Sequence, residues 1–255
     1  MLIESLSVFP EMFEPVMSTS ILGRARAAGL FEFQAHNLRD WTHDRHRTVD
    51  DEPYGGGAGM LMKVEPLHEA ITDLASDPVL PRPHVVFFTP CGVPFTQHVA
   101  ERLASYDRLL FVCGRYEGMD ERAYELADER LSIGDYVLTG GELAAMVVAD
   151  AVVRLIPGVL GDEMSNKDES FATGDDGGLL EYAQYTRPAS FNGSEVPSIL
   201  LSGDHAKVDA WRRRNAIERT CRWRPDLLDQ ARLTEVERAY ANEVLRALRA
   251  TDDSE

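Results

Sequence analysis

Four glycines fall within residues 55–59, and a segment of this composition lets a phosphate or a cofactor approach the backbone closely. A phosphate-binding P-loop requires a glycine followed directly by lysine and then serine or threonine, whereas Gly59 is followed by Met60 and Leu61. A dinucleotide-binding G-x-G-x-x-G fingerprint that starts at Gly55 fails as well, because Met60 stands where the last glycine is required. The loop therefore predicts neither kind of phosphate site.

Glycines recur in three later turns, each of which follows an apolar run that we predict to be a buried strand. The turns are FFTPCG at residues 87–92, CGRYEG at 113–118 and IGDYVLTGG at 133–141. The carboxyl ends of parallel strands meet at one edge of a sheet, where ligands of open α/β folds bind. We therefore expect a nucleotide-like pocket made largely of backbone groups. The alternative for any single turn is an ordinary strand-to-helix connection with a conformational glycine.

The elements that must position these turns alternate between strand and helix over the first 155 residues. This alternation predicts an α/β fold with an open, mostly parallel sheet covered by helices. We expect strands at 2–9, 31–38, 84–90, 108–114 and 131–138, and helices at 19–29, 64–75, 96–106, 121–127 and 142–154. Residues 158–178 are rich in glycine and acidic residues and predict a linker. Helices follow at about 204–220 and after Thr234, where Glu237 completes a capping box.

The charge of the chain is strongly negative, with 43 acidic against 26 basic residues and a formal net charge of −17. Two segments are nevertheless basic: residues 39–48, which include Arg45 and Arg47, and residues 211–224, which hold six arginines. Screening over a Debye length of about 8 Å lets such segments bind RNA phosphates locally. We expect Arg213 and Arg214 to point outward, while Trp211 packs into a core. Solvated arginines on an ordinary helix are the alternative interpretation.

Several classes of protein are disfavoured by composition. The longest apolar run, residues 143–153, is too short for a membrane-spanning helix and contains Asp150. The first residues lack the features of a secretory signal, and three scattered cysteines predict neither a disulfide framework nor a thiolate metal site. His43 and His46 have ligand-like spacing but no partners, so we predict no metal site from them. We expect a cytoplasmic protein with neither a membrane nor a DNA partner.

Seven segments together resemble one protein family. They are FPEMF, RDWTHDRHRTVDDEPYGGGAGMLM, VCGRYEGMDER, SIGDYVLTGGELAAM, IPGVLG, YTRP and LLSGDHAKVDAWRR, in this order along the chain. These motifs are similar to those of the bacterial tRNA (guanine-N1)-methyltransferases, the TrmD family of the SPOUT superfamily. The resemblance implies a methyltransferase domain with a deep C-terminal trefoil knot, contrary to the general avoidance of knots in protein folds. It also implies a small all-helical C-terminal domain and a homodimer with active sites at the subunit interface.

The implied reaction is methyl transfer from S-adenosylmethionine to N1 of the guanosine at position 37 of tRNA, which supports reading-frame maintenance. The implied domains are a knotted methyltransferase domain at 1–160, a flexible linker at 161–184 and a tRNA-binding domain at 185–255. The resemblance places Arg154 at the target base. It also places a catalytic aspartate where this chain reads KDESF. Alignment on the serine and phenylalanine favours Glu169 as the general base, with Asp168 as the alternative.

The resemblance also assigns residues to the two substrates. The implied donor-binding residues are Thr89, Pro90, Gly92, Gly114, Ile133, Gly134, Asp135, Tyr136, Val137, Leu138, Gly140 and Gly141. The implied tRNA-binding residues are Gly59, Arg115, Tyr116, Glu117, Arg45, Arg47, Arg213 and Arg214. Glu117 faces either the substrate or a magnesium ion on this view, although the sequence shows no preformed metal cluster. Two rival functions are methylation of another RNA site and RNA binding without catalysis.

Overall fold

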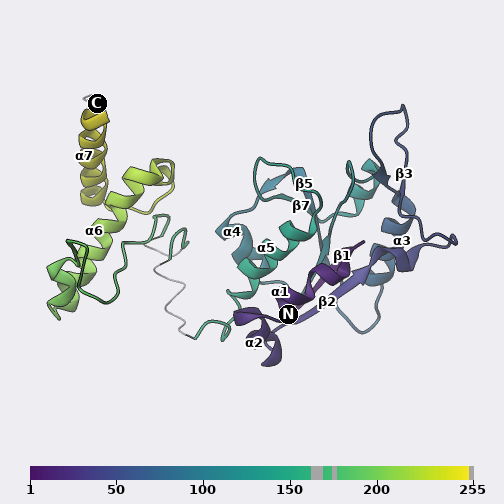
Figure 1. The fold of residues 1–255 in the computed structure, drawn as a ribbon, viewed down its shortest axis with the longest axis horizontal. Helices are drawn as coiled ribbons and strands as arrows, with labels where there is room; N and C mark the ends of the chain where they lie inside the picture. Colours follow the sequence, from purple (N-terminus) through teal and green to yellow (C-terminus); the bar gives the residue numbers. More distant parts are fainter. Residues whose placement is uncertain (162–168, 174–176, 253–255) are drawn as a thin grey trace. The chain divides into compact units, whose positions relative to one another are not determined.

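The computed structural model describes residues 1–161, 169–173 and 177–252 (Figure 1). The chain divides into two compact units, Met1–Asp162 and Glu163–Glu255. Each unit has its own hydrophobic core and is described here by itself. The predicted domain limits 1–160, 161–184 and 185–255, including the flexible linker, stay predictions.

The first unit is built on a five-stranded sheet in which every pairing is parallel, so the predicted α/β fold with a parallel sheet is confirmed. The strand order is β2-β1-β6-β5-β7. The strands are β1 (Leu2–Ser7), β2 (Glu32–Asn37), β5 (His84–Pro94), β6 (Arg108–Val112) and β7 (Glu129–Ser132). Every residue of β6 is buried, because a central parallel strand is covered on both faces.

Helices cover both faces of this sheet (Figure 1). One face packs against α1 (Glu14–Met17), α2 (Ser20–Ala27), α4 (Gln97–Leu103) and α5 (Glu142–Val153). The other face packs against α3 (Val64–Ala75) and the short 3₁₀ helices η2 (Leu38–Trp41) and η3 (Glu121–Leu126). A further 3₁₀ turn, η1 (Pro10–Met12), follows β1. The residue pattern explains α3, whose buried Leu67, Ala70 and Ile71 recur at helical spacing.

The predicted strand at 131–138 is too long, because β7 ends at Ser132. Gly134 has a φ of 144° and the amide of Tyr136 donates to the Gly134 carbonyl at 3.0 Å, so the chain turns out of the sheet at this glycine. The apolar residues 136–138 that suggested a longer strand are exposed to different degrees instead of being paired. The consequence is a loop, 133–141, that leaves the edge of the sheet.

The glycine-rich segment 55–59 lies in the loop between two short antiparallel strands, β3 (Asp50–Asp51) and β4 (Leu61–Met62). This loop extends away from the sheet (Figure 1), and its residues are mostly exposed. Its return to the body of the unit is fixed by backbone hydrogen bonds, from the amide of Met62 to the Gly118 carbonyl at 2.9 Å and from the amide of Glu117 to the Met60 carbonyl at 3.0 Å. The loop therefore meets the turn that follows β6.

The second unit is mainly helical and also contains a small hairpin. Its elements are β8 (Ser190–Phe191), β9 (Ser194–Glu195), η4 (Ser198–Leu201), α6 (His205–Trp223), η5 (Pro225–Asp229) and α7 (Glu235–Asp252). Its core includes Leu179, Ile217 and Leu228. The predicted capping box of α7 is confirmed, because Thr234 Oγ1 accepts from the Glu237 amide at 3.3 Å and Glu237 Oε2 accepts from the Thr234 amide at 2.8 Å. Within the described residues, no helix has the length and apolar content needed to span a membrane.

Candidate functional site

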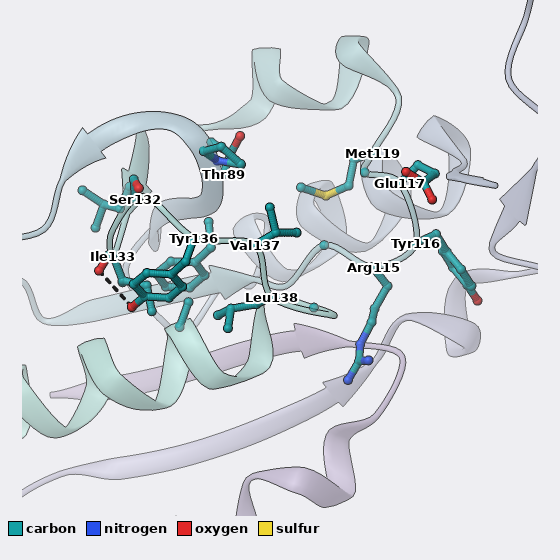
Figure 2. A pocket seen from close by; sticks show the side chains of 18 of the residues that line it. Thr89, Arg115, Tyr116, Glu117, Met119, Ser132, Ile133, Tyr136, Val137 and Leu138 are labelled. Atoms are coloured by element: carbon teal, nitrogen blue, oxygen red, sulfur yellow. Dashed lines mark hydrogen bonds between the residues drawn. The ribbon is translucent and has the colours of Figure 1, made fainter. Parts of the chain in front are cut away.

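A cavity lies where the turns after β6 and β7 meet residues 88–90 of β5 (Figure 2). The turn expected at 87–92 is instead part of β5, because this strand continues to Pro94 in its pairing with β7. Ten residues of the predicted donor set line it: Thr89, Pro90, Gly114, Ile133, Gly134, Tyr136, Val137, Leu138, Gly140 and Gly141. Three residues of the predicted tRNA set line it as well, namely Arg115, Tyr116 and Glu117. The parallel sheet brings these segments together because the chain leaves each strand at the same edge.

Two glycine contacts allow the turns after β6 and before α5 to approach each other. The amide of Gly141 donates to the Gly114 carbonyl at 2.8 Å. A Cβ atom on Gly141 would stand 2.8 Å from the Cα atom of Cys113 and 3.0 Å from the amide nitrogen of Gly114. No side chain fits at this position without moving backbone. The glycine therefore serves close packing, since its own φ of −79° is open to any residue.

The side chain of Tyr136 folds back over residues 133 and 134 of its own loop, which follows β7. Its hydroxyl donates to the Ile133 carbonyl at 3.1 Å (Figure 2). Its ring lies against Gly134, where a Cβ atom would stand 2.5 Å from Tyr136 Cε1. A glycine is thus required at position 134 both for its positive φ and for the space that the ring fills.

Some residues of the two predicted sets lie at opposite ends of the cavity, whereas Gly140 of the donor set is bridged to Arg115 of the tRNA set. Figure 2 shows Ser132, Ile133 and Tyr136 at one end, with Tyr116 and Glu117 at the other. Burial raises the pKa of the Tyr116 hydroxyl, and the nearby carboxylate of Asp50 raises this pKa further. The hydroxyl therefore stays protonated at neutral pH.

The opening glycine loop reaches this second end through Gly59. A Cβ atom on Gly59 would stand 2.4 Å from Cγ of Glu117, and its φ of 84° already favours glycine. The predicted association of Gly59 with the same region as Glu117 thus has a direct geometric basis. By contrast, nothing lies within 4 Å of the positions that Cβ atoms would take on Gly55 and Gly56.

Two residues of the predicted donor set are not among the cavity-lining residues in the described part of the chain: Gly92 and Asp135. Gly92 lies in an irregular part of β5, where Phe88 and Val93 both pair with Leu131. A Cβ atom on Gly92 would stand 2.4 Å from the Leu131 carbonyl carbon. This glycine therefore allows the close approach of β5 to β7.

The arginines of residues 39–48 lie outside the cavity as well. Arg47 forms an ion pair with Asp40, and its Nε donates to the Arg39 carbonyl at 3.1 Å. The Arg39 side chain returns a hydrogen bond to the Arg47 carbonyl at 2.8 Å. Arg47 therefore shapes its own loop in this structure, while Arg45 is exposed. RNA contact by either arginine stays a prediction.

The two predicted arginines of α6 differ in their surroundings. Arg213 does not point freely into solvent as expected: its side chain is 25% exposed, and its Nε lies 2.7 Å from Glu237 Oε1 of α7. Arg214 is exposed, donates to the Tyr240 hydroxyl at 2.8 Å and stacks its guanidinium 4.4 Å from the centre of the Tyr240 ring. Arg213 thus connects the two helices, and RNA contact by either residue stays a prediction.

The residues expected to perform chemistry belong to different units. Arg154 follows α5 in the first unit, where its amide donates to the Asp150 carbonyl at 3.2 Å. Glu169 begins a turn in the second unit, and its carbonyl accepts from the Ala172 amide at 3.2 Å. The next residue fixes this turn, because Ser170 Oγ accepts from the Glu181 amide at 2.9 Å. Asp168 lies outside the described residues.

Sequence reasoning missed several residues of the site. Met119, Tyr124, Leu131, Ser132 and Ala144 also line the cavity, as do Phe88 and Gly118, which lie within the segments 87–92 and 113–118 that were expected to form it. It also missed Glu142, which is buried beside Arg115. A carboxylate in the first turn of a helix is ordinarily read as solvated charge at the helix N-terminus, so no pattern in the sequence marked it. Burial raises the pKa of the Cys113 thiol well above its ordinary value, and the negative charge of Glu142 contributes to this rise.

The chain is thus an α/β protein with a cavity at the carboxyl ends of parallel strands, the position at which open α/β folds bind their ligands. The family model described as tRNA (Guanine-1)-methyltransferase TrmD matches residues 1–230. A tRNA (guanine-N(1)-)-methyltransferase of Dehalococcoides mccartyi strain 195 is 50% identical over 246 residues, which cover 96% of this chain and 97% of the relative. The enzyme of the same name from Bacillus subtilis strain 168 is 50% identical over 244 residues, 95% of this chain and 98% of the relative.

The matched region contains all the residues that line the cavity and the turn that begins at Glu169. This chain therefore belongs to the TrmD family of tRNA (guanine-1)-methyltransferases.

Proposed function

We propose that this chain transfers a methyl group from S-adenosylmethionine to N1 of the guanosine at position 37 of tRNA, giving 1-methylguanosine. The observation that carries the proposal is the cavity formed by the glycine turns after β6 and β7 and by residues 88–90 of β5, in a chain whose family is described as tRNA (Guanine-1)-methyltransferase. A modified base beside the anticodon would support maintenance of the reading frame. The rival functions, methylation of another RNA site and RNA binding without catalysis, lack a specific observation in their favour.

The cavity has the chemical character that an adenosine and a methionine chain require. Glycines at 114, 140 and 141 let the turns that line the cavity pack closely on one another, and Leu131, Ile133, Val137 and Leu138 supply apolar walls. The donor would be held mainly by these groups, with Thr89 and Pro90 at the wall that β5 provides. When bound, the donor supplies an activated methyl group on a sulfonium.

The acceptor requires a base and a stabilising cation, because N1 of guanine carries a proton at neutral pH. We assign proton removal to the carboxylate of Glu169, with Asp168 as the alternative. Arg154 would stabilise the negative charge that develops toward O6. The N1 lone pair then forms the new N–C bond to the methyl group while the C–S bond breaks. The electron pair of the broken C–S bond remains on sulfur. In this scheme the base and the cation come from different units of the chain.

The proposed assembly is a homodimer. The stripe of exposed side chains on α5, formed by Leu143, Val147 and Asp150, recurs at helical spacing on an otherwise buried helix. A second copy of the chain covering this stripe would remove the two apolar side chains from water.

The proposal also includes the trefoil knot. The close approach of Gly92 to β7 and of Gly141 to Gly114 supports it, because a knot requires segments distant in sequence to pack tightly at one edge of the sheet.

The remaining parts of the proposal concern the setting of the enzyme. The cysteines at 91, 113 and 221 are free, which fits a reducing compartment such as the cytoplasm. Residues 185–255 are assigned to tRNA binding. No cluster of three or more metal-ligating side chains occurs among residues 1–161, 169–173 and 177–252. Any magnesium requirement would therefore involve Glu117 together with ligands from the substrates.

The test is a methyl-transfer assay with two tRNA transcripts that differ only at position 37, where one carries guanosine and the other adenosine. We expect product from the guanosine transcript alone, identified as 1-methylguanosine by mass spectrometry of the digested nucleosides. Absence of product from that transcript would contradict the proposed reaction. Product from the adenosine transcript would contradict the proposed specificity.

The Gly59→Val variant should impair use of tRNA more than binding of the donor. The new side chain would collide with Glu117 at the acceptor end of the cavity. We expect a roughly tenfold rise in KM for tRNA, the range typical of overpacking, with an unchanged Kd for S-adenosylmethionine by calorimetry. Gly56→Val is the matched control, because φ of Gly56 is also positive at 75° but no atom stands in the way. Equal losses in both substrates would contradict the assignment.

A further inference from the structure

Glu142 is a buried carboxylate at the start of α5, and it is contacted by side chains from two distant parts of the first unit. Ser7 Oγ, at the end of β1, donates to Glu142 Oε1 at 2.6 Å. Arg115 Nε, in the turn after β6, donates to the same oxygen at 3.1 Å and lies 2.9 Å from Oε2. The side chain of Glu142 is only 1% exposed. The charge of this carboxylate is therefore balanced inside the protein.

Arg115 is also held by contacts with its other nitrogens. Nη1 donates to the Thr139 carbonyl at 3.3 Å, and Nη2 lies 3.3 Å from Met12 Sδ. Cζ stands 4.6 Å from the centre of the Phe9 ring, a cation–π distance. The side chain is 17% exposed. The guanidinium thus spans from the end of β1 to the loop that precedes α5.

The loop that Arg115 reaches is the one that carries Gly140 and Gly141. Arg115 and Gly140 form an antiparallel bridge, and a Cβ atom on Gly140 would stand 2.3 Å from Arg115 Nε and 2.5 Å from Glu142 Oε2. The bridge to Gly140 and the hydrogen bond from Nη1 to the Thr139 carbonyl therefore connect Arg115 to the backbone that lines the cavity.

We propose that Glu142 is a positioning residue, which acts through Arg115 to hold residues 139–141 in the shape that binds the methyl donor. On this view Arg115 belongs to the donor side of the site, although its motif had suggested tRNA binding. Ser7 is part of the same device, because its hydroxyl fixes one carboxylate oxygen. This inference rests on the proposed function, since it names the donor as the ligand whose affinity changes.

The pair should show strong coupling, because each charge compensates the other. Removal of one partner from a buried ion pair leaves an uncompensated charge and is costlier than removal of both. The double variant Glu142→Gln/Arg115→Gln should therefore lose less donor affinity than the sum of the losses measured for the two single variants.

The experiment measures binding of S-adenosylmethionine by calorimetry and, separately, kcat and KM for the guanosine-37 transcript. For Glu142→Gln we expect the Kd of the donor to rise about tenfold, the usual scale for hydrogen bonds to charged groups, with KM for tRNA within about twofold of wild type. Glu142→Asp should recover part of the affinity. Arg82→Gln is the matched control: Arg82 pairs with Asp128 at 2.9 Å in the same unit, at the start of β5 and away from the cavity.

Two results would overturn the inference. One is a raised KM for tRNA in Arg115→Gln with an unchanged donor Kd, which would return Arg115 to the acceptor side. The other is a reduced binding stoichiometry with unchanged Kd in Glu142→Gln, which would mean that the carboxylate only supports folding. Failure of the proposed function is distinguishable, because the wild-type chain would then bind no donor or yield no product from the transcript.

Discussion

Replacement of Glu169 by glutamine should lower kcat for methyl transfer about 10³-fold while leaving the Kd of S-adenosylmethionine unchanged. A fall in kcat of this size is expected when a reaction whose nucleophile must be deprotonated loses its general base. Glutamine keeps the size and the hydrogen-bonding capacity of the side chain but cannot accept the N1 proton. Single-turnover measurements with saturating tRNA isolate this chemical step from binding.

Asp168→Asn is the control for the Glu169 variant, because Asp168 is the adjacent carboxylate of the same motif. We expect it to keep kcat within about an order of magnitude of wild type, the spread that loss of a neighbouring, non-reacting charge can cause. Glu169 is the proposed base because alignment on Ser170 and Phe171 places it at the catalytic position of the motif; the turn that it begins is fixed by Ser170 and by a hydrogen bond from the Phe171 amide to the Leu179 carbonyl at 3.0 Å. If Asp168→Asn alone abolishes turnover, the assignment is wrong.

Replacement of Gly141 by alanine should weaken donor binding about 10²-fold. The added methyl carbon would stand 2.8 Å from the Cα atom of Cys113, so the start of α5 must move away from the turn after β6. Overpacking against backbone costs about 1–3 kcal/mol, and the shift also breaks the hydrogen bond from Gly141 to the Gly114 carbonyl. Calorimetric titration with S-adenosylmethionine measures the effect.

Gly161→Ala serves as the control for Gly141→Ala, since nothing lies within 4 Å of the position its Cβ atom would take. The control variant should bind the donor with wild-type affinity. Normal donor binding by Gly141→Ala would mean that the turns after β6 and before α5 need not touch, and it would contradict the cavity described above.

A large part of the fold follows from local sequence patterns. The apolar runs around 84–90 and 108–114 are β5 and β6, and the helical spacing of residues 64–75 is α3. The prediction failed after Ser132, where the apolar residues of 136–138 suggested strand but the chain turns at Gly134. The reason is that apolar character alone does not distinguish a strand in a sheet from a loop that lines a cavity.

The sequence by itself determined that segments 87–92, 113–118 and 133–141 meet at one cavity, because the carboxyl-terminal parts of neighbouring parallel strands lie at the same edge of the sheet. It did not show that the first of these segments is part of β5 and not a turn. It could not determine how charges are compensated within that site. Ser7 and Glu142 are 135 positions apart, yet they share a hydrogen bond of 2.6 Å, and Arg115 joins them from a third segment. Only the tertiary structure decided this, since the order β2-β1-β6-β5-β7 sets the end of β1 beside β6 and thereby places a serine, an arginine and a carboxylate together.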